Sequence, residues 1–314
     1  MAYKTPQETT EAAVESGVAK ASSPVGKVMV GGFLAGAYIA FGSLLAISVT
    51  SGLDTKLWGT LPTLVFGAVF SLGLILVILA GSDLLTGNMA LLPVAAFAKR
   101  IRPSRIPINW ALVFVANLIG SVFVAYFLAI KTGVIGHVGG DAPGSLTFAR
   151  LSGIAHTKAI TESDTQIFLR AVACNWLVCL ALWLSLAAQD IGGKILGIFF
   201  PITAFVAMGF DHVVANMFFL PAAMFAHVPG LTWTHVINNL VFAFIGNVIG
   251  AVVFVAGAYW FLHLRGKPAG RSTADSDSGD RDATDGDGLY PRGSAAPTGG
   301  GLGGRQNVPG PATT

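Results

Sequence analysis

Long apolar runs alternate with short polar segments over most of this chain. A helix needs about 20 mainly apolar residues to cross a bilayer, so each run is predicted to form a membrane helix. The runs cover residues 28–50, 60–98, 107–130, 167–188, 194–227 and 236–264. The second and fifth runs exceed the length of one span, and polar residues interrupt both of them. The pattern therefore predicts six transmembrane helices, of which the second and fifth are broken.

The two interruptions carry the same motif, G-x-D-x-x-x-x-N-M-x-x-L-P, at residues 81–93 and again at residues 209–221. A weaker likeness joins residues 116–122 to residues 246–252, whereas the first and fourth runs do not match. Each half of the chain then holds three spans, an odd number, so the halves insert in opposite directions as an inverted repeat. We expect an all-α membrane protein in which the two broken helices meet near the midplane of the bilayer.

The composition supports a membrane protein. Hydrophobic residues make up 53% of the chain and charged residues 11%, whereas soluble domains usually carry about 25% charged residues. The net charge of +3 is spread along the chain, and no basic cluster indicates a nucleic-acid partner. The cysteines and histidines lack the spacing of metal ligands, and no catalytic motif is present. We therefore expect a protein that is not an enzyme and that has no cofactor.

The two ends of the chain differ from the apolar region, residues 28–265. The sequence Thr-Pro-Gln-Glu at residues 5–8 has the pattern of a capping box, which predicts a surface helix to about Lys20 within residues 1–27. Residues 266–314 are rich in Gly, Pro, Ser, Thr and Asp and have almost no aliphatic residues. Such a segment cannot bury enough apolar surface to fold, so we expect a disordered tail.

Basic residues gather on one side of the predicted topology. Lys and Arg are enriched in the cytoplasmic loops of membrane proteins. One side carries Lys4, Lys20, Lys27, Lys99, Arg100, Arg102, Arg105, Lys194, Arg265, Lys267 and Arg271. The other side has Lys56, Lys131, Arg150 and Lys158. Both termini, with the tail, are therefore predicted to be cytoplasmic.

His212 distinguishes the second interruption from the first, where Leu84 takes its place. An ionisable group at membrane depth is a candidate for function by default, although a buried histidine can also bond a backbone group that the break frees. Thr86 is the polar residue of the first interruption, where the second has Val214. Its hydroxyl can donate to an anion or satisfy a free carbonyl group.

The residues that both interruptions share are predicted to brace the broken helices. Asn88 and Asn216 carry amides that can satisfy the backbone groups freed at each break. Asp83 and Asp211 precede the second half of each broken helix, and we expect them to cap it.

Two further polar residues have two interpretations each. Asn175, taken to begin the fourth span, either caps that helix or faces a pore. Lys158, in the loop between the third and fourth spans, either draws anions to a pore mouth or is simply solvated.

Residues 80–87, 173–181 and 209–217 resemble the signature stretches of the formate/nitrite transporter family. That family usually has Glu at the position of Asp211. The resemblance covers residues 28–265 and implies an aquaporin-like fold, a homopentamer with one pore per protomer, and passage of small monovalent anions across the plasma membrane. The Gly-Ala-Tyr stretch at residues 36–38 and Cys-Asn-Trp at 174–176 are more similar to nitrite-type than to formate-type members.

The resemblance also implies roles for single residues. His212 falls on the central histidine of the family, Thr86 and Asn175 on its neighbours, and Lys158 on a lysine at the pore mouth. The apolar constrictions of the pore fall on Phe70, Leu74, Leu85, Val178 and Phe205.

The sequence thus predicts an anion channel whose partners are small monovalent anions, protons and the lipid bilayer. A proton from His212 would convert the anion into a neutral acid, which crosses an apolar constriction at lower energy. The first alternative is an aquaporin-like channel for neutral small solutes, although this chain has Asn-Met where aquaporins have Asn-Pro-Ala. The second alternative is a membrane-embedded enzyme or sensor, for which the chain lacks a nucleophile–base pair.

Overall fold

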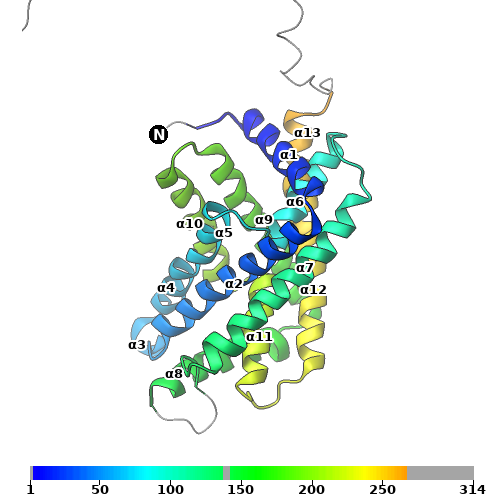
Figure 1. Ribbon diagram of the computed structural model, residues 1–314. Helices are drawn as coiled ribbons and strands as arrows, with labels where there is room; N and C mark the ends of the chain where they lie inside the picture. Colours follow the sequence, from blue (N-terminus) through cyan, green and yellow to red (C-terminus); the bar gives the residue numbers. More distant parts are fainter. Residues whose placement is uncertain (1–2, 137–141, 267–314) are drawn as a thin grey trace, which may run out of the picture. The chain divides into compact units, whose positions relative to one another are not determined.

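The computed structural model describes residues 3–136 and 142–266, and these residues form helices without a named strand (Figure 1). Five helical stretches are long and apolar enough to cross a membrane. They are α2 (Val25–Thr50), α4–α5 (Leu61–Leu79), α7–η1 (Arg105–Ile130), α9 (Asp164–Ala187) and α12–η3–α13 (Trp233–His263). The predicted disordered tail, residues 266–314, lies outside the described residues apart from its first position.

The two long apolar runs are divided where the sequence predicts. The second run gives α4 (Leu61–Phe70), α5 (Leu72–Leu79) and α6 (Leu85–Phe97), and the fifth gives α10 (Ile191–Ala207) and α11 (Val213–Phe225). The non-helical residues between them, 80–84 and 208–212, are here called the first break and the second break.

Glycines make both breaks possible. Gly81 has a φ of +77° and Gly209 a φ of +73°, in the left-handed region that side chains with a Cβ disfavour. A further division falls at Ser71, between α4 and α5. The shared glycines of the repeated motif thus end the first half of each broken helix.

Helices pack pairwise through small residues. Gly36 of α2 lies so close to α7 that a Cβ on it would sit 2.1 Å from the Asn117 carbonyl oxygen. Gly250 of α12 (Trp233–Ala251) meets α9 in the same manner, with 2.3 Å to the Val172 carbonyl oxygen. Such close approach of backbones is typical of helix pairs in membranes, where dispersion contacts drive association.

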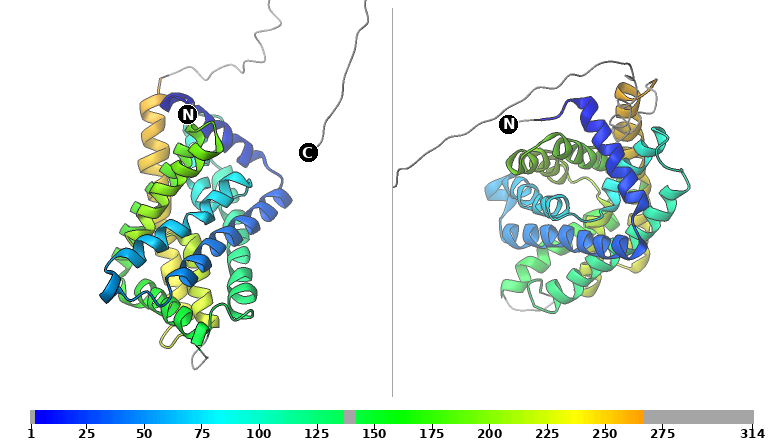
Figure 2. Two further views of the ribbon diagram at one scale, coloured as in Figure 1. Left: turned by 90° about the vertical axis from the view of Figure 1, so that its left-hand side faces the viewer. Right: turned by 45° about the horizontal axis from the view of Figure 1, so that its top comes forward.

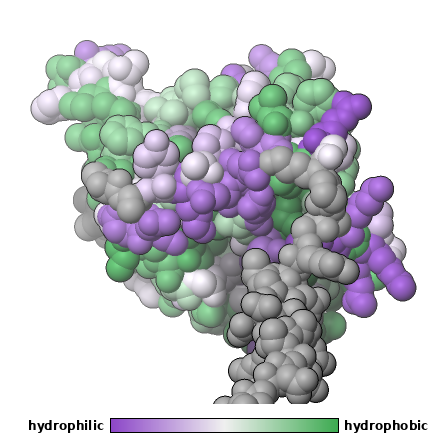
Figure 3. Space-filling view, turned by 90° about the horizontal axis from the view of Figure 1, so that it is seen from above, coloured by the Kyte–Doolittle hydropathy of each residue, from purple (hydrophilic) through white to green (hydrophobic). Residues whose placement is uncertain are grey.

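The helix α1 (Pro6–Ser22) begins with the predicted capping box, in which Thr5 and Glu8 bond each other's backbone N–H. The hydrogen bond from the Thr5 backbone lowers the pKa of Glu8. Helix α1 contacts α6 and lies at the same end of the molecule as α13 (Ala258–His263) (Figure 2). Hydrophilic residues gather on this end (Figure 3).

The opposite end carries α3 (Thr55–Trp58), α8 (Ala142–His156) and η2 (Thr157–Thr161) (Figure 1). The one-turn helix η2 is π-helical, as are η1 (Val124–Ile130) and η3 (Val252–Gly257), which continue α7 (Arg105–Phe123) and α12. Short π-helical segments of this kind often lie at functional sites.

Candidate functional site

The second break meets the first turn of α6 at a hydrogen bond. The Thr86 Oγ1 lies 2.9 Å from the His212 Nε2. Both side chains are buried. Thr86 belongs to the first turn of α6, and His212 immediately precedes α11. The structure therefore brings together the two polar residues that the repeat analysis singled out.

The second ring nitrogen of His212 caps α11. The Ala215 backbone N–H donates to the His212 Nδ1 over 3.1 Å, so this nitrogen carries no proton. The proton of a neutral imidazole then sits on Nε2 and is donated to the Thr86 Oγ1. Since its oxygen accepts this bond, the Thr86 hydroxyl keeps its own proton for another acceptor. With a neutral imidazole, Thr86 therefore keeps one hydroxyl proton that it can donate beside His212.

Two asparagines cap the half-helices in place of the expected aspartates. The Asn117 Oδ1 accepts from the Leu85 backbone N–H, and the Asn247 Oδ1 accepts from that of Val213, each over 2.9 Å. Each Asn Nδ2 also donates 2.9 Å to the carbonyl oxygen of the aspartate in its break, Asp83 or Asp211. The expected capping by aspartate side chains is therefore wrong, because the helix N–H groups already have a partner from a neighbouring helix.

The two aspartates instead pair with lysines. The Lys20 Nζ lies 2.5 Å from the Asp83 Oδ1, and the Lys158 Nζ lies 2.9 Å from the Asp211 Oδ1. The Lys158 side chain is only 13% exposed, so it is not a freely solvated charge. Local sequence does not indicate the Lys20–Asp83 pair, because the two residues lie 63 positions apart in the chain.

The shared asparagines of the motif bond neighbouring helices, α7 after the first break and α12 after the second. The Asn88 Nδ2 donates to the Asn109 Oδ1 over 2.9 Å, and the Asn216 Nδ2 donates to the Asn239 Oδ1 over 2.8 Å. Asn216 also donates to the Asp211 Oδ1 over 2.9 Å.

Asn175 lies in the middle of α9, which begins at Asp164, so it does not begin or cap the helix. Its Nδ2 donates to the Asn247 carbonyl oxygen over 2.8 Å and to the Thr86 carbonyl oxygen over 3.2 Å. Asn175 therefore fixes the backbone that carries Thr86. The alternative of a pore-facing amide stays a prediction.

A small apolar cavity adjoins His212, with a volume of about 10 Å³, room for roughly one water molecule. Four of the five predicted constriction residues line it, whereas Leu85 does not and its neighbour Leu84 does. The lining residues are Ile39, Phe70, Leu74, Leu84, Val178, Ile202, Phe205 and His212.

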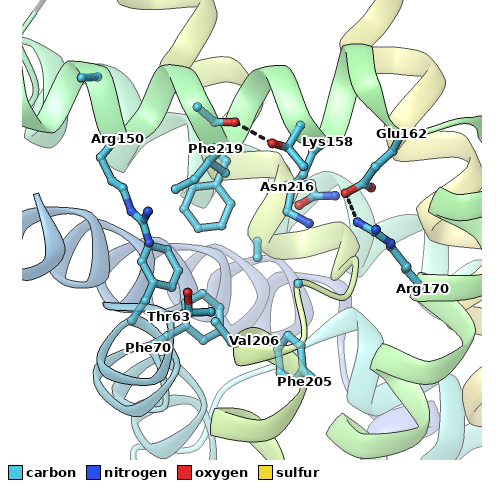
Figure 4. A pocket seen from close by; sticks show the side chains of 17 residues that line it. Thr63, Phe70, Arg150, Lys158, Glu162, Arg170, Phe205, Val206, Asn216 and Phe219 are labelled. Carbon is cyan, nitrogen blue, oxygen red and sulfur yellow. Dashed lines mark hydrogen bonds and ion pairs between the residues drawn. The ribbon is translucent and has the colours of Figure 1, made fainter. Parts of the chain in front are cut away.

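A larger cavity, here called the vestibule, has a volume of about 390 Å³ and lies beside the second break (Figure 4). Phe70 and Phe205 line both cavities, and their rings meet edge to face with centroids 6.0 Å apart. This aromatic pair therefore separates the vestibule from the cavity at His212. The vestibule also holds charged side chains, among them Lys158, Glu162 and Arg170.

Four functional candidates of the structure are not predicted by the sequence analysis. Asn117 and Asn247 lie in the repeated stretches of the third and sixth spans. An asparagine at the same position of two matching apolar stretches is the pattern that could have indicated their role. Glu162 and Arg170 form an ion pair at the vestibule, and nothing in the local sequence indicates it.

Comparisons with known proteins show the family of this chain. Residues 7–261 match the family described as formate/nitrite transporter. A probable formate transporter of Methanothermobacter thermautotrophicus is 48% identical over 272 residues, covering 84% of this chain and 98% of that protein. The nitrite transporter NirC of Salmonella typhimurium is 33% identical over 245 residues, covering 77% and 84%. A solved pentameric formate channel with formate bound has a TM-score of 0.67 at 26% identity, covering 77% of this chain and 98% of that one.

Proposed function

Because this chain belongs to the formate/nitrite transporter family, we propose that it is a multi-pass membrane channel for small monovalent anions such as formate and nitrite. The observation that carries the proposal is the buried Thr86–His212 pair beside a narrow apolar cavity. A dehydrated anion needs hydrogen-bond donors at such a point, because the loss of its hydration is unfavourable. The higher identity to the relative named for formate makes formate the first anion to test.

We further propose the six-span inverted repeat, with α4–α5–α6 as the broken second span and α10–α11 as the broken fifth. The matched roles of Asn117 and Asn247 support it, since each binds a break and its following half-helix in the same manner. The pentameric neighbour supports a homopentamer. The two cavities, which a single chain lines, support one pore in each protomer. The excess of Lys and Arg at one side supports cytoplasmic termini.

In the proposed mechanism an anion enters the vestibule, where Lys158 contributes positive charge. It then passes the pair Phe70 and Phe205, which leaves no room for a hydration shell. Beyond the pair, the Thr86 hydroxyl donates to the anion, and His212 polarises that hydroxyl by donating to its oxygen. Apolar constrictions of this kind exclude cations, which find no acceptor to replace their water.

Protonation of the anion by His212 requires a further change. The ring can donate a proton to an anion when it is an imidazolium. Forming the imidazolium places a proton on Nδ1, which then can no longer accept the hydrogen bond from the Ala215 N–H. We propose that His212 acts first as a neutral donor to Thr86, and that proton transfer, if coupled to transport, opens the cap of α11.

The test is uptake of isotopically labelled formate and nitrite by liposomes that contain the purified protein. We expect uptake well above that of empty liposomes, a strong loss in Thr86→Val, and retention in the matched control Thr86→Ser, which keeps the hydroxyl. Water permeability without anion uptake would support the aquaporin-like alternative and contradict the proposal.

A further inference from the structure

The vestibule holds a cation whose charge the described residues do not neutralise. Lys158 pairs with Asp211, and Arg170 pairs with Glu162. Arg150 of α8 also lines the vestibule (Figure 4) but has no ion-pair partner within residues 3–136 and 142–266. An unpaired charge in a half-buried position is unfavourable unless a ligand or water satisfies it.

Arg150 is also held in a defined orientation. Its guanidinium carbon lies 5.2 Å from the centroid of the Phe66 ring, at the distance of a cation–π contact. Its Nε is buried and has no hydrogen-bond partner among the described residues. Burial lowers the pKa of Arg150, although a guanidinium stays charged in proteins. The side chain therefore presents an oriented positive group with free N–H donors to the vestibule.

We propose that Arg150 forms a binding site for planar anions with two oxygen atoms, short carboxylates and nitrite, in the vestibule ahead of the Phe70–Phe205 pair. This inference rests on the proposed function and names the chemistry that selects its substrate. A guanidinium offers two parallel N–H donors that match the two oxygens of such an anion, whereas a lysine ammonium acts as a point charge. Spherical or one-centre anions gain less from this geometry.

The walls of the site suit the remainder of a short carboxylate. Phe66, Phe70 and Phe219 line the vestibule near Arg150, and Figure 4 shows Phe70 and Phe219 facing the space between Arg150 and the Glu162–Arg170 pair. An apolar hydrogen or methyl group gains contact with these rings while the oxygens bind the guanidinium. Arg150 thus collects and orients the anion one step before dehydration.

The experiment measures formate uptake against concentration for wild type, Arg150→Met and Arg150→Lys in liposomes. We expect the KM for formate to rise roughly tenfold in Arg150→Met, as for loss of a charge-assisted bond, with the maximal rate within about twofold. Arg150→Lys keeps the charge and should show an intermediate KM. The matched control is Lys56→Met, which removes an exposed charge from α3 at the same end of the molecule (Figure 1) and should keep the wild-type KM.

Binding of ¹³C-formate to the detergent-solubilised proteins, read from its NMR line width, should weaken in the same order. A wild-type KM and line width in both Arg150 variants overturns the inference and leaves the proposed function intact. An equal rise of KM in Lys56→Met also overturns it, because the effect is then one of net charge. Absence of anion uptake by the wild type removes the proposed function together with this site.

Discussion

At the scale of single residues, both ring nitrogens of His212 take part in hydrogen bonds. Its Nδ1 accepts from the Ala215 backbone, and its Nε2 meets Thr86. The sequence could single out these two polar residues because they differ between otherwise matching motifs. It could not show that they touch, since 126 positions separate them, and distances across the fold are not contained in local pattern.

Substitution of His212 separates its two proposed roles. An asparagine can accept the Ala215 N–H with its carbonyl oxygen and donate to Thr86 with its amide, but it cannot carry a proton to an anion. If hydrogen bonding suffices, His212→Asn retains most formate uptake, whereas His212→Ala loses it. The measurement is initial uptake rate between pH 5.5 and 7.5. Loss of uptake in His212→Asn equal to that in His212→Ala, in a protein of unchanged thermal stability, supports protonation instead.

At the scale of elements, each break depends on an asparagine from a neighbouring helix. The positions of both breaks follow from the sequence, because polar residues and glycines interrupt runs that are too long for one span. The caps did not follow, because Asn247 bonds residues 34, 36 and 76 positions away. Local rules favour aspartate as a cap, and here tertiary packing supplies a closer partner.

Asn247→Ala should destabilise the protein more than an ordinary helix substitution. It leaves the Val213 N–H and the Asp211 carbonyl group without their partner, and each buried unsatisfied group costs about 1–3 kcal/mol. We expect a clear drop in the thermal midpoint measured in detergent, together with reduced uptake. The control is Asn238→Ala, which removes an exposed asparagine of the same helix and should leave the midpoint nearly unchanged. Equal midpoints for the two variants contradict the capping role.

At the scale of the whole molecule, one lysine–aspartate pair lies at each break. Further charged side chains line the vestibule beside the second break. The repeat predicts the matched aspartates, and both have lysine partners. Arg150, Glu162 and Arg170 come from α8, the turn after η2, and α9, where the halves do not match. The sequence alone therefore could not assemble the vestibule, although it identified the fold class and the broken helices.

The vestibule should respond to pH through Glu162. Burial and the neighbouring Asp211 raise the pKa of Glu162 to about 7, against the opposing effects of Lys158 and Arg170. Because this pKa lies above its ordinary value, the folded protein favours the protonated carboxyl group. The resulting contribution to folding stability is present at low pH and is lost as the pH rises through about 7. Below pH 7 the vestibule loses one negative charge and should bind anions more tightly.

We therefore expect the KM for formate to fall a few-fold when the pH at the vestibule drops from 8 to 6, and this change to be smaller in Glu162→Gln. The KM of that variant at pH 8 should resemble the wild-type value at pH 6. The control Asp164→Asn removes an exposed carboxylate two residues away and should keep the wild-type pH response. An unaltered response in Glu162→Gln rules out this carboxyl group as its source.

The hydrogen bond between the Ala215 N–H and the His212 Nδ1 also bears on whether protons can leak through the pore. A histidine shuttles protons along a wire when one nitrogen takes up a proton while the other releases one. Here the backbone occupies the nitrogen that the relay needs, so a pore that is open to anions has no imidazole relay for bare protons. While this bond holds, we therefore expect anions to pass without a leak of bare protons through His212.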